Sequence, residues 1–413
     1  MKQINLNIIT SSSLTFLILM QFLQDFSFTY FILLSLCYLI TFYIFIINPR
    51  FPSLNTMVGF FYFLTLFAFF IIIIESFTYL LDGSSTYELV NGSVRLLLMP
   101  TFAIVLFILI RNASDLNIIK KIYIFFIILA AISIFYQVIY GKLSFVANPY
   151  GALRFGLPGF ASITGAVNTY PGAFYSAVIL LFFSSYKNEF IKVALILLMC
   201  GAAIFTMSKS GLLNVILLLL ILTIAGIFFK KWRFLLYLYL ISIIILLISN
   251  QILNATVIAV VNTFGIELLN STKSSATEWQ PLIPRITDRI FGVFLSSDMP
   301  TILEFLFGTG LKGGSGTTGF YAPTTHNSFL DVYVMGGITS LIILVGLYLS
   351  VQITLLWKFY LSSDLFDLAL FTSNLLMLIN GLVHNGVLFH PAMSFTFWIS
   401  VAYIFIYYDK LES

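Results

Sequence analysis

The chain has 413 residues, of which 60% are hydrophobic and only 9% are charged, with a formal net charge of +4. Its mean hydropathy is +1.05, and its charged fraction is far below the roughly 25% of an ordinary soluble domain. This composition excludes a soluble globular fold. Long apolar runs from end to end predict an all-α polytopic membrane protein.

The predicted membrane spans follow from runs of roughly 18 to 25 apolar residues, the length a helix needs to cross a bilayer. Twelve such runs are expected, at about 5–24, 28–48, 56–80, 94–111, 118–140, 166–185, 190–207, 211–229, 234–253, 329–357, 367–383 and 391–408. The chain then divides into a membrane domain at 1–253 with spans 1–9, a large extracytoplasmic loop at 254–328, and a membrane domain at 329–413 with spans 10–12.

The positions of the twenty lysines and arginines predict the orientation, because positively charged loops stay on the cytoplasmic side. With the N-terminus inside, twelve are cytoplasmic: Lys2, Arg50, Arg111, Lys120, Lys121, Lys187, Lys192, Lys230, Lys231, Arg233, Lys358 and Lys410. The other eight are external: Arg95, Lys142, Arg154, Lys209, Lys273, Arg285, Arg289 and Lys312. We therefore expect both termini in the cytoplasm. External cations that go against this bias need another reason to exist, and anion binding is the obvious candidate.

The two cysteines, Cys37 and Cys200, lie inside apolar runs, so the sequence predicts neither a disulfide framework nor a thiolate metal site. The N-terminal apolar run carries one lysine, Lys2, and lacks a convincing small-residue cleavage site, so we expect the first helix to be retained. The external carboxylates are scattered, so no metal site is expected.

The long loop holds the residues best suited to chemistry. Arg285 and Arg289 are four positions apart, so a helix there would place both guanidinium groups on one face, where they suit phosphate binding. Contacts with Asp288 and lipid headgroups are the structural alternative. Glycine-rich turns follow at Gly308-Thr309-Gly310 and at 313–316; they allow close backbone approach to a ligand, or they form a flexible loop tip.

Three histidines, His326, His384 and His390, fall on the external side in this orientation. His326 lies at the mouth of the tenth span, where it can serve as a general base near neutral pH or fill a structural role. Asn168 and Tyr170 combine hydrogen-bonding groups with a ring, which makes them candidate sugar contacts.

Several segments share the order of a known family's motifs. Thr206-Met207-Ser208-Lys209-Ser210-Gly211 is similar to a T, any, S, R, S, G segment at a span boundary. Arg289 is followed, after eighteen residues, by Gly308-Thr309-Gly310, and His326-Asn327 is followed by Gly336-Gly337. Arg154 and Gly165 have ten residues between them, as in an Arg-to-Gly loop motif of some polymerases. Together these segments resemble the O-antigen ligase and Wzy-type polymerase superfamily.

This resemblance implies a metal-independent glycosyltransferase without a cofactor. Such enzymes move a lipid-linked oligosaccharide onto an acceptor at the outer face of the bacterial cytoplasmic membrane and release undecaprenyl diphosphate. His326 stands where the family has its base, with Asn327 as a substrate contact, and Arg289 where it has a diphosphate-binding arginine.

Lys209 stands where a second arginine is usual. Lysine keeps the charge but loses the bidentate geometry, so Arg285 or Arg154 compensates or the diphosphate is held differently. Without the resemblance, a lysine snorkelling from a helix end is the simpler interpretation of Lys209.

Within the superfamily we favour a polymerase, which joins one lipid-linked repeat unit to another, over a ligase, which transfers finished glycan to a final acceptor. A twelve-span flippase for the same lipid-linked units and a structural scaffold remain alternatives; the sequence shows no internal repeat of the kind that transporters carry. The expected partners are an undecaprenyl-diphosphate-linked oligosaccharide, membrane lipid, and flippase and chain-length regulator proteins. No nucleic acid is expected.

Overall fold

The computed structural model describes residues 5–20, 27–78, 86–141, 143, 150–154, 157–164, 168–206, 208–248, 301–313, 327–384 and 386–412. The chain forms two compact units. Unit 1 consists of Met1–Thr15, Ile32–Ile119 and Thr287–Ser413, and unit 2 of Phe16–Phe31 and Lys120–Ile286. The predicted loop at 254–328 therefore lies largely outside the described residues, and the proposed domain boundaries stay a prediction.

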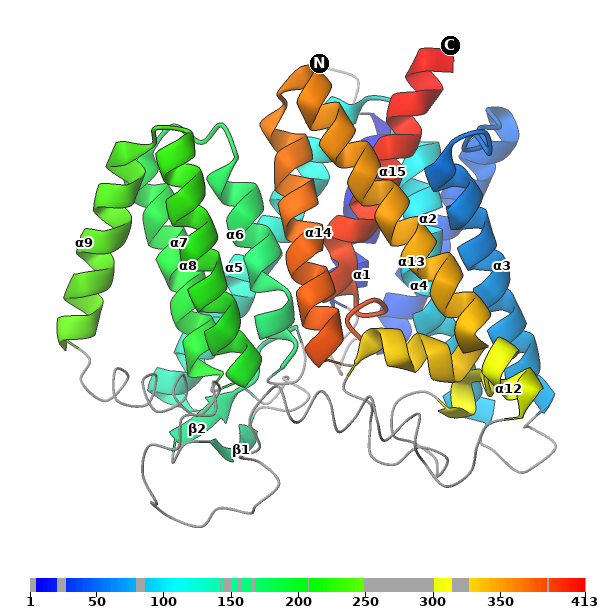
Figure 1. Cartoon of the computed structure of the whole chain (residues 1–413), viewed down its shortest axis with the longest axis horizontal. Helices are drawn as coiled ribbons and strands as arrows, with labels where there is room; N and C mark the ends of the chain where they lie inside the picture. Colours follow the sequence, from blue (N-terminus) through cyan, green and yellow to red (C-terminus); the bar gives the residue numbers. More distant parts are fainter. Residues whose placement is uncertain are drawn as a thin grey trace. The chain divides into compact units, whose positions relative to one another are not determined.

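The elements of unit 1 are mostly long helices (Figure 1). They are α3 (Met57–Thr78), α4 (Thr86–Leu109), η3 (Ala113–Asp115), α12 (Ile302–Phe307), η5 (Gly310–Gly313), α13 (Ser328–Ser362), α14 (Leu365–Val383) and α15 (Pro391–Glu412). The helices α1 (Leu6–Met20) and α2 (Ser27–Ile47) begin the chain, and each contributes to both units.

Unit 2 adds a small hairpin to its helices. Its elements are α5 (Leu116–Tyr140), whose first turn belongs to unit 1, β1 (Tyr150–Arg154), β2 (Leu157–Phe160), η4 (Tyr170–Gly172), α6 (Phe174–Phe182), α7 (Glu189–Phe205), α8 (Lys209–Phe228) and α9 (Trp232–Ile248). The strands pair antiparallel, with Tyr150 opposite Phe160 and Arg154 opposite Leu157.

The apolar sequence makes these helices because hydrocarbon offers backbone groups no other hydrogen-bond partner. The same constraint applies to the side-chain hydroxyl groups, which donate hydrogen bonds to backbone carbonyl oxygens in the preceding turn. Thr15 Oγ1 donates to Ser11 O at 2.7 Å, Thr41 Oγ1 to Cys37 O at 2.8 Å, and Thr65 Oγ1 to Phe61 O at 2.8 Å. Serine and threonine therefore interrupt the apolar runs without interrupting the helices.

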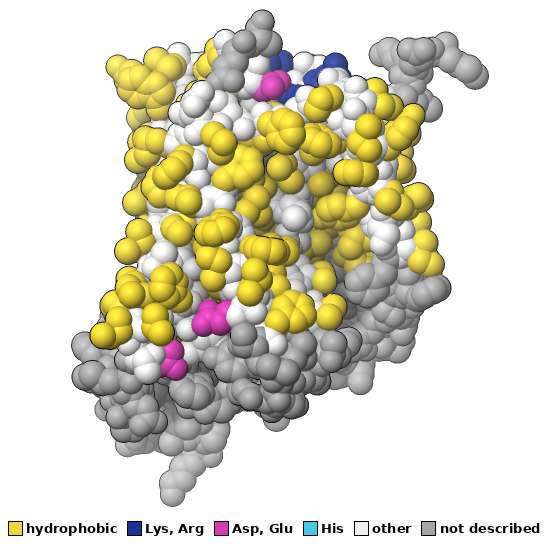
Figure 2. Space-filling view, turned by 90° about the vertical axis from the view of Figure 1, so that its right-hand side faces the viewer, with side chains coloured by type: hydrophobic (Ala, Val, Ile, Leu, Met, Phe, Trp, Pro, Cys, Tyr) yellow, Lys and Arg dark blue, Asp and Glu magenta, His cyan; other side chains and the backbone are white. Residues whose placement is uncertain are grey.

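The predicted all-α membrane class is confirmed. Among the residues that the structure describes, seven helices are long and apolar enough to cross a membrane, and four shorter apolar helices accompany them. The face drawn in Figure 2 carries a broad band of hydrophobic side chains, with lysine and arginine gathered at one end. Each of the twelve predicted runs overlaps a helix of the structure, while the count of twelve spans and the large external loop stay predictions.

Several element boundaries differ from those predicted, for identifiable reasons. Span 6 was expected at 166–185, but α6 covers only Phe174–Phe182 because a 3-10 turn containing Pro171 precedes it. Helix α13 continues past 357 because Lys358 is accommodated: its Nζ lies 3.9 Å from Asp367 Oδ1 and 3.4 Å from the centroid of the Tyr407 ring. The β1–β2 hairpin was not predicted.

Helix α13 organises unit 1. It packs against α3 and α14, and α12 lies on it, while α15 packs against α4. Among the helices, polar side chains bond to one another: Tyr348 Oη donates to Asn374 O at 2.8 Å, and Asn374 Nδ2 to Ser400 Oγ at 2.9 Å. Such bonds join α13, α14 and α15 where apolar contacts alone specify little.

Candidate functional site

The predicted site residues divide between the two units. In unit 1, Asn327 is fully described, whereas His326 and Arg289 lie outside the described residues. In unit 2, Asn168 and Tyr170 are described with their side chains. The remaining predictions are only partly covered. The backbones of Arg154, the last residue of β1, and Lys209, the first residue of α8, are described without their side chains, and Arg285 lies outside the described residues.

Asn327 begins α13 as its N-cap. Its backbone is extended, and its Oδ1 accepts hydrogen bonds from Phe329 N at 2.9 Å and Leu330 N at 3.1 Å. Asparagine suits this position because its short side chain reaches the free amides of the first turn. The side chain is buried, so the residue that follows His326 in the sequence has a fixed position.

The first turn of α13 is joined to the connection between α14 and α15. Ser328 Oγ donates to His384 O at 2.7 Å and accepts from Val387 N at 2.8 Å, and Asp331 Oδ2 accepts from Gly386 N at 3.2 Å. Ser328 and Asp331 are both buried. These bonds join the first turns of α13, which begins after Asn327, to the backbone of His384, Gly386 and Val387.

His384 and Ser328 are residues that the sequence analysis did not assign to the site. His384 ends α14 as its C-cap, and its Nε2 atom is buried. The available signal was the sequence His384-Asn385-Gly386, which repeats the His-Asn pair of His326-Asn327 at the far end of the next helix. In the structure Ser328, the residue after the first pair, donates a hydrogen bond to the carbonyl oxygen of His384, the first residue of the second pair.

Gly308 and Gly337, one from each glycine motif of the resemblance, lie where the end of α12 meets α13. Gly308 has φ +84°, and a Cβ placed on it would lie 2.4 Å from Gly336 N. Gly337 has φ +67° and interrupts the helical geometry of α13, and a Cβ on it would lie 2.3 Å from Leu306 O. Neither site admits a side chain. These glycines allow the backbones at the end of α12 and in α13 to approach each other closely. The sequence predicted approach to a ligand or a flexible loop tip at this turn, and not this contact.

Thr309 completes this contact. Its backbone N donates to Val334 O at 2.9 Å, and its Oγ1 lies 3.1 Å from the same oxygen. In a straight helix Val334 O would accept from the amide four residues later, but the kink at Gly337 alters that geometry. Beyond it, Leu311 N donates to Ser76 Oγ of α3 at 2.7 Å. The described segment from Gly308 to Leu311 is therefore held between α3 and α13.

In unit 2 the turn between α7 and α8 is built from buried hydroxyl groups. Ser208 Oγ lies 2.8 Å from Ser210 Oγ and 3.2 Å from Asn168 Oδ1, and Ser208 N donates to Thr206 Oγ1 at 3.3 Å. The structure thus brings together two predicted segments, the one around Asn168 and the one containing Lys209. Asn168 holds the turn that presents the first residue of α8.

Tyr170 is completely buried, and its hydroxyl donates to Met199 O at 3.0 Å. Its ring stacks on Phe174 at 5.8 Å between centroids. Nearby, Asn214 Nδ2 donates to Pro171 O at 2.8 Å, and a Cβ on Gly211 would lie 2.9 Å from Ala203 O. Tyr170 therefore packs the α7–α8 turn in place, and the prediction that it contacts sugar stays untested.

The N-terminus of α8 favours negative charge. A helix N-terminus carries a partial positive charge and unpaired amides. The N-cap Ser208 makes no side-chain capping bond, because its hydroxyl bonds elsewhere, and the first turn holds no acidic residue. Lys209 adds a cation at the end of the helix where the dipole disfavours one. An anion bound there would relieve that repulsion.

Within the described ranges, no cluster of three or more His, Cys, Asp or Glu side chains could hold a metal ion. No family model matches the sequence, and no curated protein matches it either. The assignment of a function therefore depends on the motif residues and their geometry.

Proposed function

We propose that the protein is a polysaccharide polymerase of the bacterial cytoplasmic membrane, which transfers a polyprenyl-diphosphate-linked glycan onto another lipid-linked repeat unit at the outer face. A hydroxyl group of the acceptor sugar attacks C1 of the donor sugar. The bond from C1 to the diphosphate oxygen breaks, His326 takes the hydroxyl proton, and the lipid diphosphate leaves. The chemistry requires cations at the leaving group and a base at the acceptor.

The observation that carries this proposal is the position of Lys209 at the N-terminus of α8. A lysine there is unfavourable by itself, since the helix dipole is positive at this end. The buried turn of Thr206, Ser208 and Ser210 fixes the backbone that bears it. Lysine and helix amides together suit a diphosphate, with Arg289 and either Arg285 or Arg154 as further cations.

The described surroundings of Asn327 support the acceptor half of the proposal. The cap, the bonds from Ser328 to the α14–α15 connection and the locked glycines fix the start of α13. The residue before this cap in the sequence is His326, the proposed base, and a base positioned at the acceptor hydroxyl lowers the barrier to proton transfer. Asn327, Asn168 and Tyr170 are the proposed sugar contacts with described side chains.

The testing experiment gives the purified full-length protein, in lipid and with chelator, a single lipid-diphosphate-linked repeat unit as substrate. A ladder of longer glycans on lipid diphosphate supports the polymerase. Transfer only after a separate acceptor is added indicates a ligase. Movement of the lipid-linked unit from one leaflet of the vesicle membrane to the other, without glycan transfer, indicates a flippase and would overturn the proposal.

Variants test the assigned residues in the same assay. His326→Ala removes the base and should lower the rate by about 100-fold or more, in the range of general-base catalysis. Lys209→Ala should cost a similar factor of about 100 through lost charge stabilisation, while Lys209→Arg retains activity. The matched control is Lys230→Ala, at the other end of α8, which should polymerise as the wild type does. Wild-type polymer from His326→Ala would remove the catalytic assignment.

A further inference from the structure

Helix α12 exposes apolar side chains around almost its whole circumference. Its residues are Ile302, Leu303, Glu304, Phe305, Leu306 and Phe307. The exposed fraction is 79% at Ile302 and 69% at Leu303, and the last three side chains are exposed as well. The charged residue, Glu304, is the least exposed of the six. An amphipathic helix at the surface of a protein in water has the reverse pattern, with its charge outward and its apolar side chains against the protein.

Helix α12 contacts protein along a short stretch of α13. A Cβ on Gly337 would lie 2.3 Å from Leu306 O, so the two backbones touch there. The Phe305 ring meets the Tyr333 ring edge to face, with 6.2 Å between the centroids. The exposed fractions of α12 are those that remain after these contacts. The outward surface of α12 is therefore apolar and open, and a partner reaches it without entering a pocket.

The attachment of α12 to its neighbours gives its level along the apolar helices. It meets α13 at Gly337, inside the stretch Ser328–Ser362 that is apolar and long enough to cross a membrane. The turn that follows α12 bonds to α3, where Leu311 N donates to Ser76 Oγ at 2.7 Å. Ser76 also lies inside such a stretch, Met57–Phe77. Both attachments are thus within membrane-spanning stretches, at the end where α13 begins (Figure 1).

The two neighbouring helices expose apolar side chains at this same level. Ile74 and Phe77 flank Ser76 in α3, and both are exposed. Ile342 follows Gly337 in α13 by little more than one turn and is exposed too. Apolar side chains on the outside of a membrane-spanning helix contact lipid. Helix α12 is therefore attached where the spans themselves face hydrocarbon.

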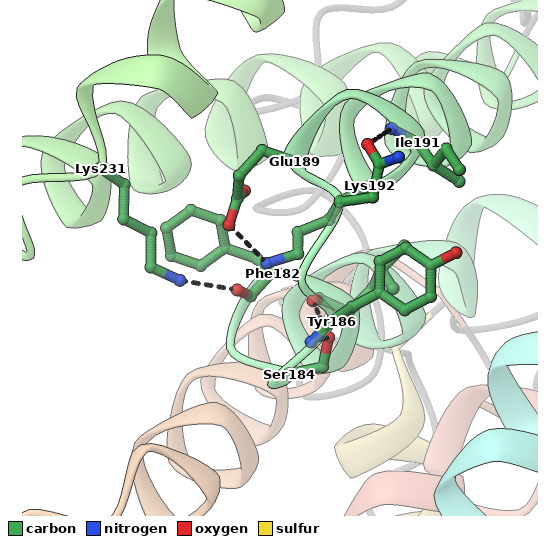
Figure 3. Close-up of polar contacts among 9 residues, drawn as sticks. Phe182, Ser184, Tyr186, Glu189, Ile191, Lys192 and Lys231 are labelled. Atoms are coloured by element: carbon green, nitrogen blue, oxygen red, sulfur yellow. Dashed lines mark hydrogen bonds and ion pairs between the residues drawn. The ribbon is translucent and has the colours of Figure 1, made fainter.

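Turns between helices elsewhere in the described chain have a different composition. Where α6 turns into α7 and α8 into α9, Lys187 and Lys230 are exposed, and Lys231 Nζ donates to Phe182 O at 2.9 Å (Figure 3). Water solvates exposed ammonium groups of this kind. Helix α12 has no lysine or arginine. It therefore exposes no cation that favours water over lipid.

The polar groups at the two ends of α12 bond to protein. Thr301 N donates to Glu304 Oε2 at 2.7 Å, and Glu304 N donates to Thr301 Oγ1 at 3.2 Å. At the other end, Gly308 N donates to Glu304 O at 2.8 Å and Thr309 N to Val334 O at 2.9 Å. These are backbone groups that hydrocarbon could not solvate. The capping box also uses the one carboxylate of the helix.

We propose that α12 lies in the membrane, in the leaflet on the side where α13 begins, and that its exposed side chains contact the acyl chains of membrane lipids. In the predicted orientation this is the outer leaflet. An exposed apolar surface of this extent marks a contact with lipid or protein, and the level of α12 along the spans favours lipid. Because α12 is joined to α13 at the glycine contact, its position in the leaflet also sets the depth at which α13 begins. This membrane contact is independent of the proposed polymerase activity.

Spin labelling measures the surroundings of α12 directly. Ile302→Cys and Leu303→Cys are each labelled with a nitroxide in the full-length protein, which is then reconstituted in phosphatidylcholine vesicles. Electron paramagnetic resonance gives the collision rates of the label with oxygen, which dissolves in hydrocarbon, and with a water-soluble nickel chelate. The native Cys37 and Cys200 are buried and add little background. Both labels should give an oxygen-to-nickel ratio about tenfold above that of a label in water, since hydrocarbon excludes polar solutes.

Two further labelled positions serve as matched references. Phe77→Cys, 50% exposed at the end of α3, is the lipid reference at the level of α12, and Ser363→Cys, exposed in the turn before α14, is the water reference. Ratios for α12 equal to that of Ser363→Cys would overturn the proposal, because water then surrounds the helix. Low collision rates with both reagents would overturn it too, because protein then covers α12, and broadening of the spectrum by a neighbouring label would identify that protein as a second copy. The side chains of Ile302 and Leu303 point outward, so a label at either position should leave the fold intact, and elution at the wild-type volume in size-exclusion chromatography checks this.

Discussion

Among single residues, Asn327 has two functions that substitution can separate. As N-cap it accepts from Phe329 N and Leu330 N through Oδ1, and as a proposed sugar contact it would use its amide group. Asn327→Ala should lower the free energy of unfolding by about 1 kcal/mol, whereas Asn327→Asp keeps an acceptor and the cap. Thermal unfolding of the purified variants measures this difference. Equal destabilisation by both changes would contradict the capping role. Loss of polymer formation in Asn327→Asp, which keeps the cap, would support a sugar contact by the Asn327 amide group.

Arg50 is a second residue whose contacts can be separated. Its Nη1 donates to Phe107 O at 3.0 Å and to Ile110 O at 3.2 Å at the end of α4, and its Nη2 pairs with Asp409 of α15. Arg50→Ala should lower the free energy of unfolding by about 1 to 2 kcal/mol, because it frees two helix-terminal carbonyls.

The control for Arg50 is Asp409→Asn. The Asp409 side chain is 38% exposed, so the ion pair itself contributes little, and the loss should stay below about 1 kcal/mol. Denaturation of the two variants in the same detergent gives the comparison. A larger loss from Asp409→Asn than from Arg50→Ala would mean that the ion pair, and not the capping of α4, stabilises this end of unit 1.

At the scale of elements, the sequence located the helices because a membrane-spanning helix is recognised by the length and hydrophobicity of an apolar run. No periodic pattern of apolar and polar residues is needed. The contacts between elements were not predictable in this way. The kink of α13 at Gly337 depends on Leu306, thirty-one residues earlier in the sequence. The hairpin at Tyr150–Phe160 is too short to stand out in an apolar chain. Of the candidate site, the sequence identified Asn327 but not its connection to Ser328, Asp331 and His384.

The interlocked glycines lead to a prediction about α12 and α13. Gly337→Ala and Gly308→Ala each place a methyl group within 2.4 Å of backbone atoms of the other segment, where neither backbone can move far. Each should lower the free energy of unfolding by at least about 3 kcal/mol, from the clash and from the positive φ. Yield and thermal unfolding of the purified variants are the measurements.

The control for this lock is Gly141→Ala at the end of α5. Gly141 also has a positive φ, +87°, but a Cβ there would have no atom within 4 Å. It should cost only the left-handed strain, about 1 to 2 kcal/mol. If Gly141→Ala and Gly337→Ala are equally destabilised, backbone strain and not the packing of α12 on α13 explains the glycines.

At the scale of the whole molecule, each unit keeps its predicted cytoplasmic cations at one end of its helices. In unit 1, Arg50 contacts the end of α4, and in unit 2, Lys192 and Lys231 lie at the end of α6. The motif residues lie at the other ends, with Asn327 at the start of α13 and Lys209 at the start of α8. The charge pattern of the sequence therefore predicts that both motif ends face the outside of the cell.

Cysteine labelling in intact cells tests that orientation in both units at once. Ser185 and Ser363 are exposed in the turns before α7 and α14, and both should react as cysteines only from the cytoplasm. A cysteine at position 315 in the long loop should react only from outside. The native Cys37 and Cys200 are buried and give little background. Labelling of Ser185→Cys and Ser363→Cys from opposite sides would mean that the two units insert with opposite orientation, and a polymerase acting at one membrane face would then be excluded.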